Sequence, residues 1–338
     1  MKFPSAPPTA ADPAWAADAG LEQLLEWRRA HLQEGLGERI AVLRRPPEGS
    51  GSEAWAADRE QVHQLRTGLR RLRSMAEAFP SHWRGPSAKQ LATLARAAGT
   101  VRDLDVLLEA LQEQQRSLDG QERKRLEGLI KRLETLRSQG RHKLRKHLNH
   151  LPQHRLAAPP EASPPASHAD PSHADPADSA SAIHRDALPL LRASLIRQLA
   201  VLRLHPGWGH GERPSQDSRQ ERNQHQLRKA FKRFRYQLEL LEALEPDLRD
   251  RLLILKQTQT SLGLLQDLVI WRNLLKRQLK GKLKRQLPQL SARWRVQADS
   301  AWADWQELRR QWLDPATGLE AWQRWLLELD LKRQIPGG

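Results

Sequence analysis

Two basic stretches of the sequence share one pattern, and this repeat limits the possible folds more than any other feature. The stretch HQLRTGLRRLR begins at His63, and HQLRKAFKRFR begins at His225. A second pair of motifs, GTVRDLDVL from Gly99 and GLLQDLVIW from Gly263, follows in the same order and at nearly the same spacing. Because two motifs recur together, the sequence predicts an internal duplication, in which the chain forms two related halves.

The spacing of apolar residues predicts the kind of structure that is duplicated. Apolar residues recur at intervals of three and four, which is typical of amphipathic helices, and alternating strand patterns are hard to find. We therefore predict an all-α fold of two four-helix bundles related by internal duplication and approximate twofold symmetry. The expected helices span about 20–45, 54–79, 87–117, 120–149, 184–204, 216–244, 247–286 and 289–313, with a short helix over about 318–331.

A segment rich in Pro, Ala, Ser, His and Asp separates the two halves. Repeated prolines remove backbone donors there, so residues 151–183 are predicted to form a disordered linker. The first half of the helical domain is expected at 20–150 and the second at 184–331. Residues 1–19 are predicted to be a flexible N-terminal tail and 332–338 a C-terminal tail. The SHADP repeats of the linker could bind a metal loosely, but disordered polar composition explains them more simply.

The composition favours an anionic partner and excludes thiol chemistry. Lys and Arg number 56 against 40 acidic residues, which gives a formal net charge of +16. The chain has no cysteine, so it has no disulfide, no thiolate zinc site and no cysteine nucleophile. The N-terminal residues lack the apolar stretch of a signal peptide, and no segment is apolar enough to suggest a membrane span. We therefore expect a soluble, cytoplasmic protein with a negatively charged partner.

Each basic stretch divides into a polar and an apolar stripe at about 100° per residue. The polar stripes comprise His63, Arg66, Arg70, Arg73 and Glu77 in the first copy, and His225, Arg228, Lys232, Arg235 and Glu239 in the second. The apolar stripes comprise Leu65, Leu69, Leu72, Ala76 and Phe79, and Leu227, Phe231, Phe234, Leu238 and Leu241. If the apolar stripe packs inside a bundle, a row of cations about 15 Å long remains for an extended anion. One such helix is most simply a solvated face, but the exact recurrence favours a binding role.

Asp103 and Asp267 occupy equivalent positions in the second motif. We expect each carboxylate to hold an arginine of the polar stripe in place and to offset repulsion between the cations. A general-acid role has less support, because no second carboxylate or metal-ligand set recurs with these two residues.

The combined motifs resemble the CHAD family, the conserved histidine α-helical domain, over about residues 20–330. HQLRTGLRRLR with AGTVRDLDVL carries the likeness in the first half, and HQLRKAFKRFRYQLELLE carries it in the second. The resemblance implies two helical bundles whose basic stripes meet at a shared cationic groove or pore. It also implies binding of inorganic polyphosphate and, in some bacteria, association with polyphosphate granules. Gln266 stands where the first half has Arg102, so the second half departs from the Arg-Asp pattern.

The resemblance also implies which residues bind polyphosphate. Carried over by position, they are His63, Arg66, Arg70, Arg71, Arg73, Arg102, His225, Arg228, Lys229, Lys232, Arg233 and Arg235. Other cations crowd the fourth helix and the region after residue 275, and Arg137 is among them. Those predicted to form a secondary basic surface are Arg125, Lys131, Arg132, Arg141, Lys143, Arg145, Lys276, Arg277, Lys280, Lys282, Lys284 and Arg285. A solvated helix face explains this secondary set equally well.

Two other functions remain open from the sequence. A nucleic acid would be attracted by the same charge, but Phe231 and Phe234 lie on the apolar stripe, and the tryptophans near the C-terminus have spacings that fit helix packing. A polyphosphate-processing enzyme has less support, because no GxxxxGK[ST] element or cluster of metal-binding carboxylates is visible, and HPGWGHG from His205 reads as an interhelical loop. We therefore expect a binding protein with no catalytic residues, no cofactor and no metal.

Overall fold

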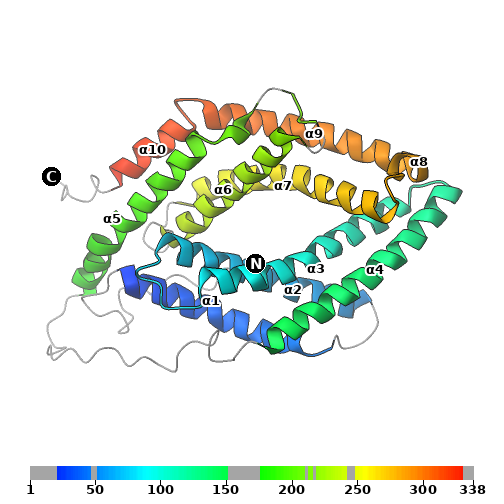
Figure 1. Ribbon diagram of the computed structural model, residues 1–338. Helices are drawn as coiled ribbons and strands as arrows, with labels where there is room; N and C mark the ends of the chain where they lie inside the picture. The colour runs from blue at the N-terminus through cyan, green and yellow to red at the C-terminus, as the bar shows by residue number, and fades with distance from the viewer. Residues whose placement is uncertain are drawn as a thin grey trace.

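The computed structural model describes residues 21–46, 52–150, 176–209, 212–215, 218–241 and 248–329. Within these ranges every regular element is helical, which confirms the all-α prediction (Figure 1). None of the described helices is both long and apolar enough to cross a membrane. The two predicted tails, and the predicted linker as far as residue 175, lie outside the described residues.

The first half contains four long helices. They are α1 (Leu21–Arg44), α2 (Ser52–Ala78), α3 (Ala88–Gln115) and α4 (Gly120–Asn149). Each packs against the next along the chain, and α1 also packs against α4. The start of α3 is fixed by a capping box, in which the Ser87 hydroxyl accepts from the Gln90 backbone and the Gln90 side chain accepts from the Ser87 backbone. All four helices agree closely with the predicted ranges.

The second half contains more elements than a four-helix bundle. They are α5 (Pro176–Arg203), the 3-10 helix η3 (Pro206–Trp208), α6 (Arg219–Leu241), α7 (Arg249–Gln278), α8 (Leu283–Gln286), α9 (Pro288–Leu313) and α10 (Leu319–Glu328). The first of these begins eight positions before the predicted start at residue 184. Proline is well suited to the first turn of a helix, where its missing N–H would have no partner, and this explains why α5 can begin at Pro176.

The helix predicted over residues 247–286 is interrupted. Lys280 and Gly281 have positive φ values of 48° and 80°. The Gly281 N–H donates to the Lys276 carbonyl over 2.7 Å, and the Lys280 N–H donates to the Arg277 carbonyl. This is a Schellman-type ending, which turns the chain after α7 and allows the short α8 to lead into α9.

The two halves pack against each other through equivalent helices. Figure 1 shows α1 to α4 on one side and α5 to α10 on the other, and α1 contacts α5, α2 contacts α6 and α3 contacts α7. Glu122 of α4 also caps α9 by accepting from the backbone N–H groups of Gln289 and Leu290. A twofold arrangement of the halves would bring these same pairs of helices together. The approximate twofold symmetry itself stays a prediction.

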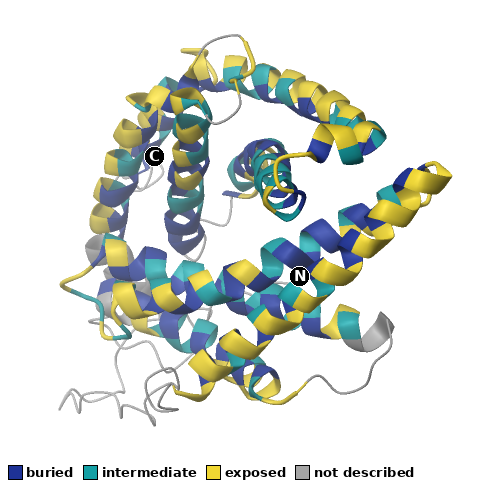
Figure 2. Cartoon of the chain, turned by 45° about the vertical axis from the view of Figure 1, so that its right-hand side comes forward, coloured by how far each residue is buried: buried dark blue, intermediate teal, exposed yellow. Residues whose placement is uncertain are grey.

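The hydrophobic core is shared between the halves. One cluster joins Leu24 and Met75 of the first half to residues of α5, α6, α7, α9 and α10. A second cluster joins α3 and α4 to α7, α8 and α9, and a third lies within the first half. Figure 2 shows buried residues along the sides of the helices that face other helices, with exposed residues on the outer sides. The halves therefore stabilise each other by burying apolar surface in common.

Candidate anion-binding site

The apolar stripes of α2 and α6 are buried as predicted. Leu65, Leu69 and Leu72 of α2 are fully buried, and so are Phe231 and Phe234 of α6. Their burial fixes the rotation of each helix about its axis, because the other stripe must then face away from the local core. The rotation of α2 and α6 therefore decides where the basic residues point.

The basic stripes of α2 and α6 come together across the boundary between the halves. Arg228 is only 9% exposed, and Arg66, Arg70 and Lys232 are half-buried. Burial, followed by the positive charges of Arg228, Arg70 and Arg66, lowers the pKa of Lys232 to about 6. Since two of these arginines belong to the other half, the stripes lie within electrostatic reach of each other. They are not separate solvated faces.

Asp103 and Asp267 lie among these cations. Arg66 contacts Asp103, with 3.4 Å between Nη2 and Oδ1, and its pKa is lowered to about 10 by burial and Arg70 while Asp103 opposes the shift. Asp267 acts in the same direction on Arg228, and burial raises the pKa of Asp267 itself. The predicted contact between an aspartate and a stripe arginine is thus confirmed for Asp103.

Gly99 explains part of this geometry. A methyl group added at Gly99 would lie 3.3 Å from Nε of Arg66, whereas one added at Gly263 would meet nothing within 4 Å. The first glycine of the repeated motif therefore leaves room for the Arg66 guanidinium. The equivalent glycine in the second half has no such role.

The two histidines have different neighbours in the two halves. Burial and then the charge of Arg102 lower the pKa of His63. Burial, followed by the charges of Lys229 and Arg228, lowers the pKa of His225 to about 4, while a hydrogen bond with Gln266 opposes the shift. Both imidazoles are therefore neutral at neutral pH, and Arg102 and Gln266 occupy matching places beside them. A neutral imidazole can still donate one hydrogen bond to an anion.

Three of the predicted site arginines are engaged by glutamates at the far end of the stripes. Nε of Arg71 lies 2.9 Å from Glu239, and Nε of Arg235 lies 3.2 Å from the same carboxylate, which is 6% exposed. Arg73 pairs with Glu77 on its own helix over 2.8 Å. Glu239 therefore joins α2 to α6. The sequence placed Glu239 on the stripe but gave no sign of this inter-half contact, since Arg71 lies off the stripe.

Lys229 and Arg233 lie to one side of the stripe on α6. Lys229 is exposed, and its pKa is lowered by burial of part of the side chain and then by Arg228, Arg233, Arg73 and Arg70. Burial and then the positive charge of Arg233 lower the pKa of His205.

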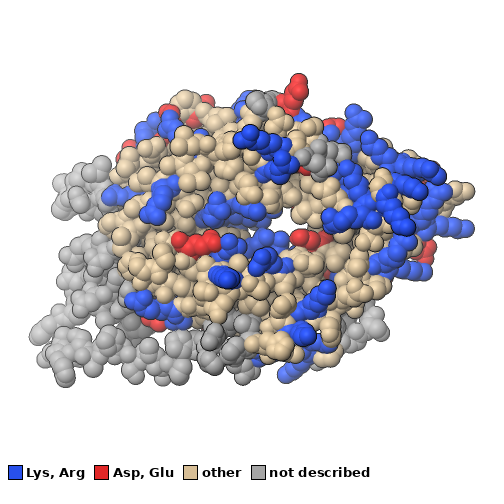
Figure 3. All heavy atoms as spheres, viewed as in Figure 1, with Lys and Arg blue, Asp and Glu red and all other residues tan. Residues whose placement is uncertain are grey.

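Figure 3 shows an opening through the molecule with Lys and Arg atoms on both sides of it and acidic atoms nearby.

The prediction that Arg141 belongs to a secondary basic surface is wrong. Arg141 is 5% exposed, and it donates to Asp58 over 2.9 Å and to the Leu43 carbonyl over 2.8 Å. Arg137 is buried too and donates to Asp105 over 2.8 Å. Both continue the buried stripe of α4 at successive intervals of four after Leu133, so helical spacing could have identified them.

The remaining cations of the predicted secondary surface are accessible to solvent. Arg145 and Lys276 are half-buried, and the exposed members are Arg125, Lys131, Arg132, Lys143, Arg277, Lys280, Lys282, Lys284 and Arg285. Some already have partners, since Lys131 pairs with Glu127 on the same helix. The cations on this surface are therefore spread over α4 and the region from α7 to α8 instead of forming one row.

The other sequence motifs have structural roles. His205 caps η3 by accepting from the Gly207 N–H, and Trp208 stacks on Trp305, so the described part of the glycine-rich segment is an interhelical loop. Trp305, Trp312 and Trp322 are buried in the core. In the described ranges, no group of three or more His, Asp or Glu side chains is arranged to hold a metal ion.

Comparisons with known proteins agree with the fold. A sequence model described as the CHAD domain matches residues 50–276. The structure is similar to that of the CHAD domain from the plant Ricinus communis, with a TM-score of 0.54 and 23% identity over 96% of this chain and 97% of that one. It is also similar to PptA from Streptomyces chartreusis, with a TM-score of 0.52 and 17% identity over 86% of this chain and 99% of that one. No curated protein sequence matches significantly.

Proposed function

The chain belongs to the CHAD domain family, and we propose that it binds inorganic polyphosphate in a groove between α2 and α6. Polyphosphate binding is a property of this family. The residues proposed to contact the ligand are those of the two facing stripes, His63, Arg66, Arg70, His225, Arg228 and Lys232, with Arg102 and Lys229 at the edges. Arg71, Arg73, Arg233 and Arg235 would contribute to the field around the groove, since three of them already bind carboxylates.

The observation that carries the proposal is the mutual approach of the two stripes. Lys232 of α6 lies close enough to Arg66 and Arg70 of α2 for their charges to depress its pKa. Holding like charges together in a partly buried place costs free energy, and Asp103 and Asp267 offset only part of it. A bound polyanion would offset the rest and return the Lys232 pKa toward its usual value.

The chemistry of the stripes favours polyphosphate over nucleic acid. A polyphosphate chain carries about one negative charge per phosphate and has no bases, so many charge-assisted contacts are sufficient to bind it. Single-stranded nucleic acid is usually bound with the help of stacking on exposed aromatic rings. Phe231 and Phe234, the aromatic residues of the basic helices that face the core, are fully buried. Nucleic acid remains the alternative partner through the exposed cations of α4 and α8.

The first experiment compares ligands of matched total charge. Long-chain polyphosphate should bind at least about ten-fold more tightly than RNA or duplex DNA at the same ionic strength, and its affinity should fall with salt as counterions are released. Fluorescence anisotropy with labelled ligands would measure this. Equal affinity for the three polymers would contradict a specific polyphosphate site.

The second experiment locates the site. Reversing the charges of Arg66, Arg70, Arg228 and Lys232 should weaken polyphosphate binding by about a hundred-fold or more, because each position contributes a close contact. The matched control reverses four exposed cations of the secondary surface, namely Arg125, Lys131, Arg132 and Lys143. Glutamine variants of the first set, with helicity checked by circular dichroism, separate loss of charge from misfolding. Similar losses in both sets would indicate diffuse attraction.

The protein is proposed to bind polyphosphate without cleaving or extending it. Incubation with polyphosphate and Mg²⁺, followed by product analysis, tests the less favoured function of a polyphosphate-processing enzyme, and steady release of shorter products would contradict the proposal.

We further propose that the groove directs the protein to polyphosphate granules. A fluorescent fusion should then move with the granules and become diffuse when Arg66, Arg70, Arg228 and Lys232 are reversed in charge.

A further inference from the structure

A second cavity lies within the second half, between α6, α7, α8 and α9. Its volume is about 550 Å³, which falls in the range of pockets that bind small organic molecules. Leu265, Leu268 and Arg272 line it from one face of α7, whereas Asp267, which interacts with the groove cations, lies on a different face of the same helix. The cavity therefore lies on a different side of α7 from Asp267, and it adjoins the His225 end of the proposed groove through Gln224 and Leu265.

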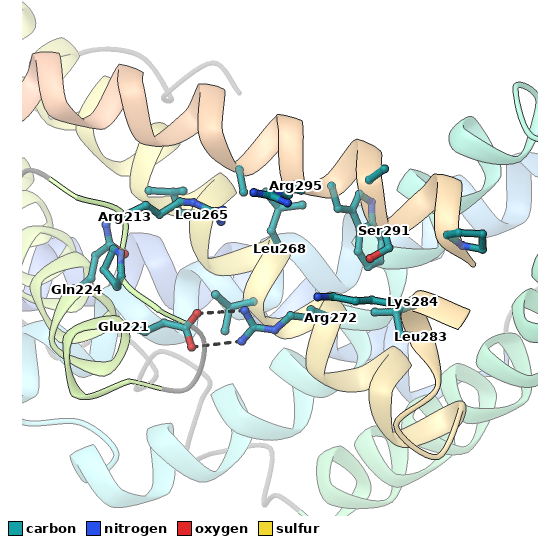
Figure 4. A pocket seen from close by; sticks show the side chains of 16 residues that line it. Arg213, Glu221, Gln224, Leu265, Leu268, Arg272, Leu283, Lys284, Ser291 and Arg295 are labelled. Carbon is teal, nitrogen blue, oxygen red and sulfur yellow. Dashed lines mark hydrogen bonds and ion pairs between the residues drawn. The ribbon is translucent and has the colours of Figure 1, made fainter. Parts of the chain in front are cut away.

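The cavity combines positive charge with an apolar floor. Its cations are Arg213, Arg272, Lys284 and Arg295, and its one acidic residue is Glu221. Figure 4 shows Arg295 reaching in from α9 and Arg272 from α7, on opposite sides of the cavity. Apolar surface comes from Leu265, Leu268, Val269, Leu283 and Trp294. A purely inorganic anion would leave this apolar surface unused, so the lining fits an anion that also carries an organic group.

The four cations differ in whether they already form ion pairs with acidic residues. Arg272 forms a two-pronged ion pair with Glu221, with N–O distances of 3.3 and 3.2 Å. Arg213 pairs with Asp299 over 2.9 Å. Lys284 and Arg295 are exposed, and neither forms an ion pair with a residue in the described ranges. These two side chains are therefore available to bind phosphate oxygens at the mouth of the cavity.

Two buried hydrogen-bond donors in the cavity lining lack partners. Nε1 of Trp294 and Nε2 of Gln224 are both buried and make no hydrogen bond to any described residue. A buried donor without a partner costs free energy, and native proteins rarely leave one unexplained. Both nitrogen atoms are inaccessible to solvent, so a ligand acceptor would reach them only if neighbouring side chains moved.

We propose that this cavity binds a nucleoside phosphate, with the phosphates held by Lys284 and Arg295 and the base beside Leu268 and Trp294. Arg272, oriented by Glu221, adds positive charge beneath the phosphates. The site would give the protein a small-molecule ligand that is independent of the polyanion in the groove.

The experiment measures ATP binding to the full chain by calorimetry at physiological ionic strength. In a chain that carries Arg66→Gln with Arg228→Gln, which weakens the proposed polyphosphate groove, ATP should bind at least about ten-fold more tightly than tripolyphosphate. Adenosine should bind weakly, because the site needs both charge and an apolar group. Lys284→Glu with Arg295→Glu should weaken ATP binding about ten-fold or more. Ala292→Trp, at an exposed position in the lining, should block the cavity without disturbing the core.

Matched variants decide between the sites. Lys131→Glu with Arg132→Glu makes the same charge change on exposed α4 and should leave ATP affinity within about two-fold, as should Arg66→Gln with Arg228→Gln in the groove. Polyphosphate binding should in turn survive Ala292→Trp. The proposal is overturned if ATP does not bind, if tripolyphosphate binds the groove variant as tightly as ATP does, or if the α4 or groove variants reduce ATP affinity as much as the cavity variants.

Discussion

Lys232 is the basic residue whose pKa is lowered most by the approach of the α2 and α6 stripes. Its pKa is lowered from the usual 10.5 to about 6, first by burial and then by the arginines of both halves. Between these two pH values the unfolded chain carries a proton on this amine that the folded protein does not. The free energy of unfolding contributed by this group must therefore rise with pH across that range.

We predict that Lys232→Met removes this pH dependence. Near pH 7 the variant should be more stable than the original chain by about 1 kcal/mol or more. Burying an amine beside other positive charges costs free energy, and the apolar methionine side chain of similar length removes that cost. The difference should shrink as the pH is raised toward 10. Urea unfolding at several pH values measures both quantities, and a difference that does not change with pH would contradict the interpretation.

At the level of the helices, α2 and α6 were predictable because one simple periodicity governs both. Leu65, Leu69 and Phe231 are buried where helical spacing placed them, and Arg66 and Lys232 face the other half. The same spacing continues the buried stripe of α4 from Leu133 to Arg141, so the predicted surface position of Arg141 is wrong. Its burial depends on Asp58 of α2, a long-range partner that periodicity alone does not identify.

Other features of the helices, such as breaks and caps, depend on contacts that no local sequence pattern predicts. The break after α7 rests on the left-handed conformation of Lys280, an unusual choice for a side-chain-bearing residue, with Gly281 after it. The cap on α9 comes from Glu122, which lies in the other half of the sequence. The cavity is lined by residues from α6, α7, α8 and α9 that share no sequence motif.

The ion pairs of Glu239 should be the strongest polar link between α2 and α6. Glu239→Gln leaves Arg71 and Arg235 close together with no carboxylate between them, and we expect it to lower the free energy of unfolding by about 3 kcal/mol. Glu77→Gln is the matched control, because Glu77 pairs with Arg73 on the same, more exposed helix face, and it should cost less than about 0.5 kcal/mol. Equal effects in urea unfolding would show that the link between the helices is unimportant.

On the scale of the whole molecule, the two predicted halves are not independent in their packing. The sequence predicts two helical halves, but two of the three hydrophobic clusters contain residues from both. Leu24 and Met75 pack with the second half, and Leu268 and Trp294 pack with the first. A periodic pattern reveals which face of a helix is apolar, but it does not reveal which helix covers that face. The groove that we propose between α2 and α6 would therefore form only where the halves share their cores.

Shared cores predict that the halves unfold together. Most tryptophans of the chain lie after residue 200, so tryptophan fluorescence reports mainly on the second half, whereas circular dichroism reports on the helices of both. The two signals should give the same urea midpoint, because opening either half exposes apolar surface of the other. Saturating polyphosphate should raise both midpoints together, because a ligand held by α2 and α6 stabilises the joined state. At a hundred times its Kd, it should add about 2.7 kcal/mol to the free energy of unfolding. Two separate transitions, or a shift confined to one signal, would mean that the halves are energetically independent and that the groove is not a joint site.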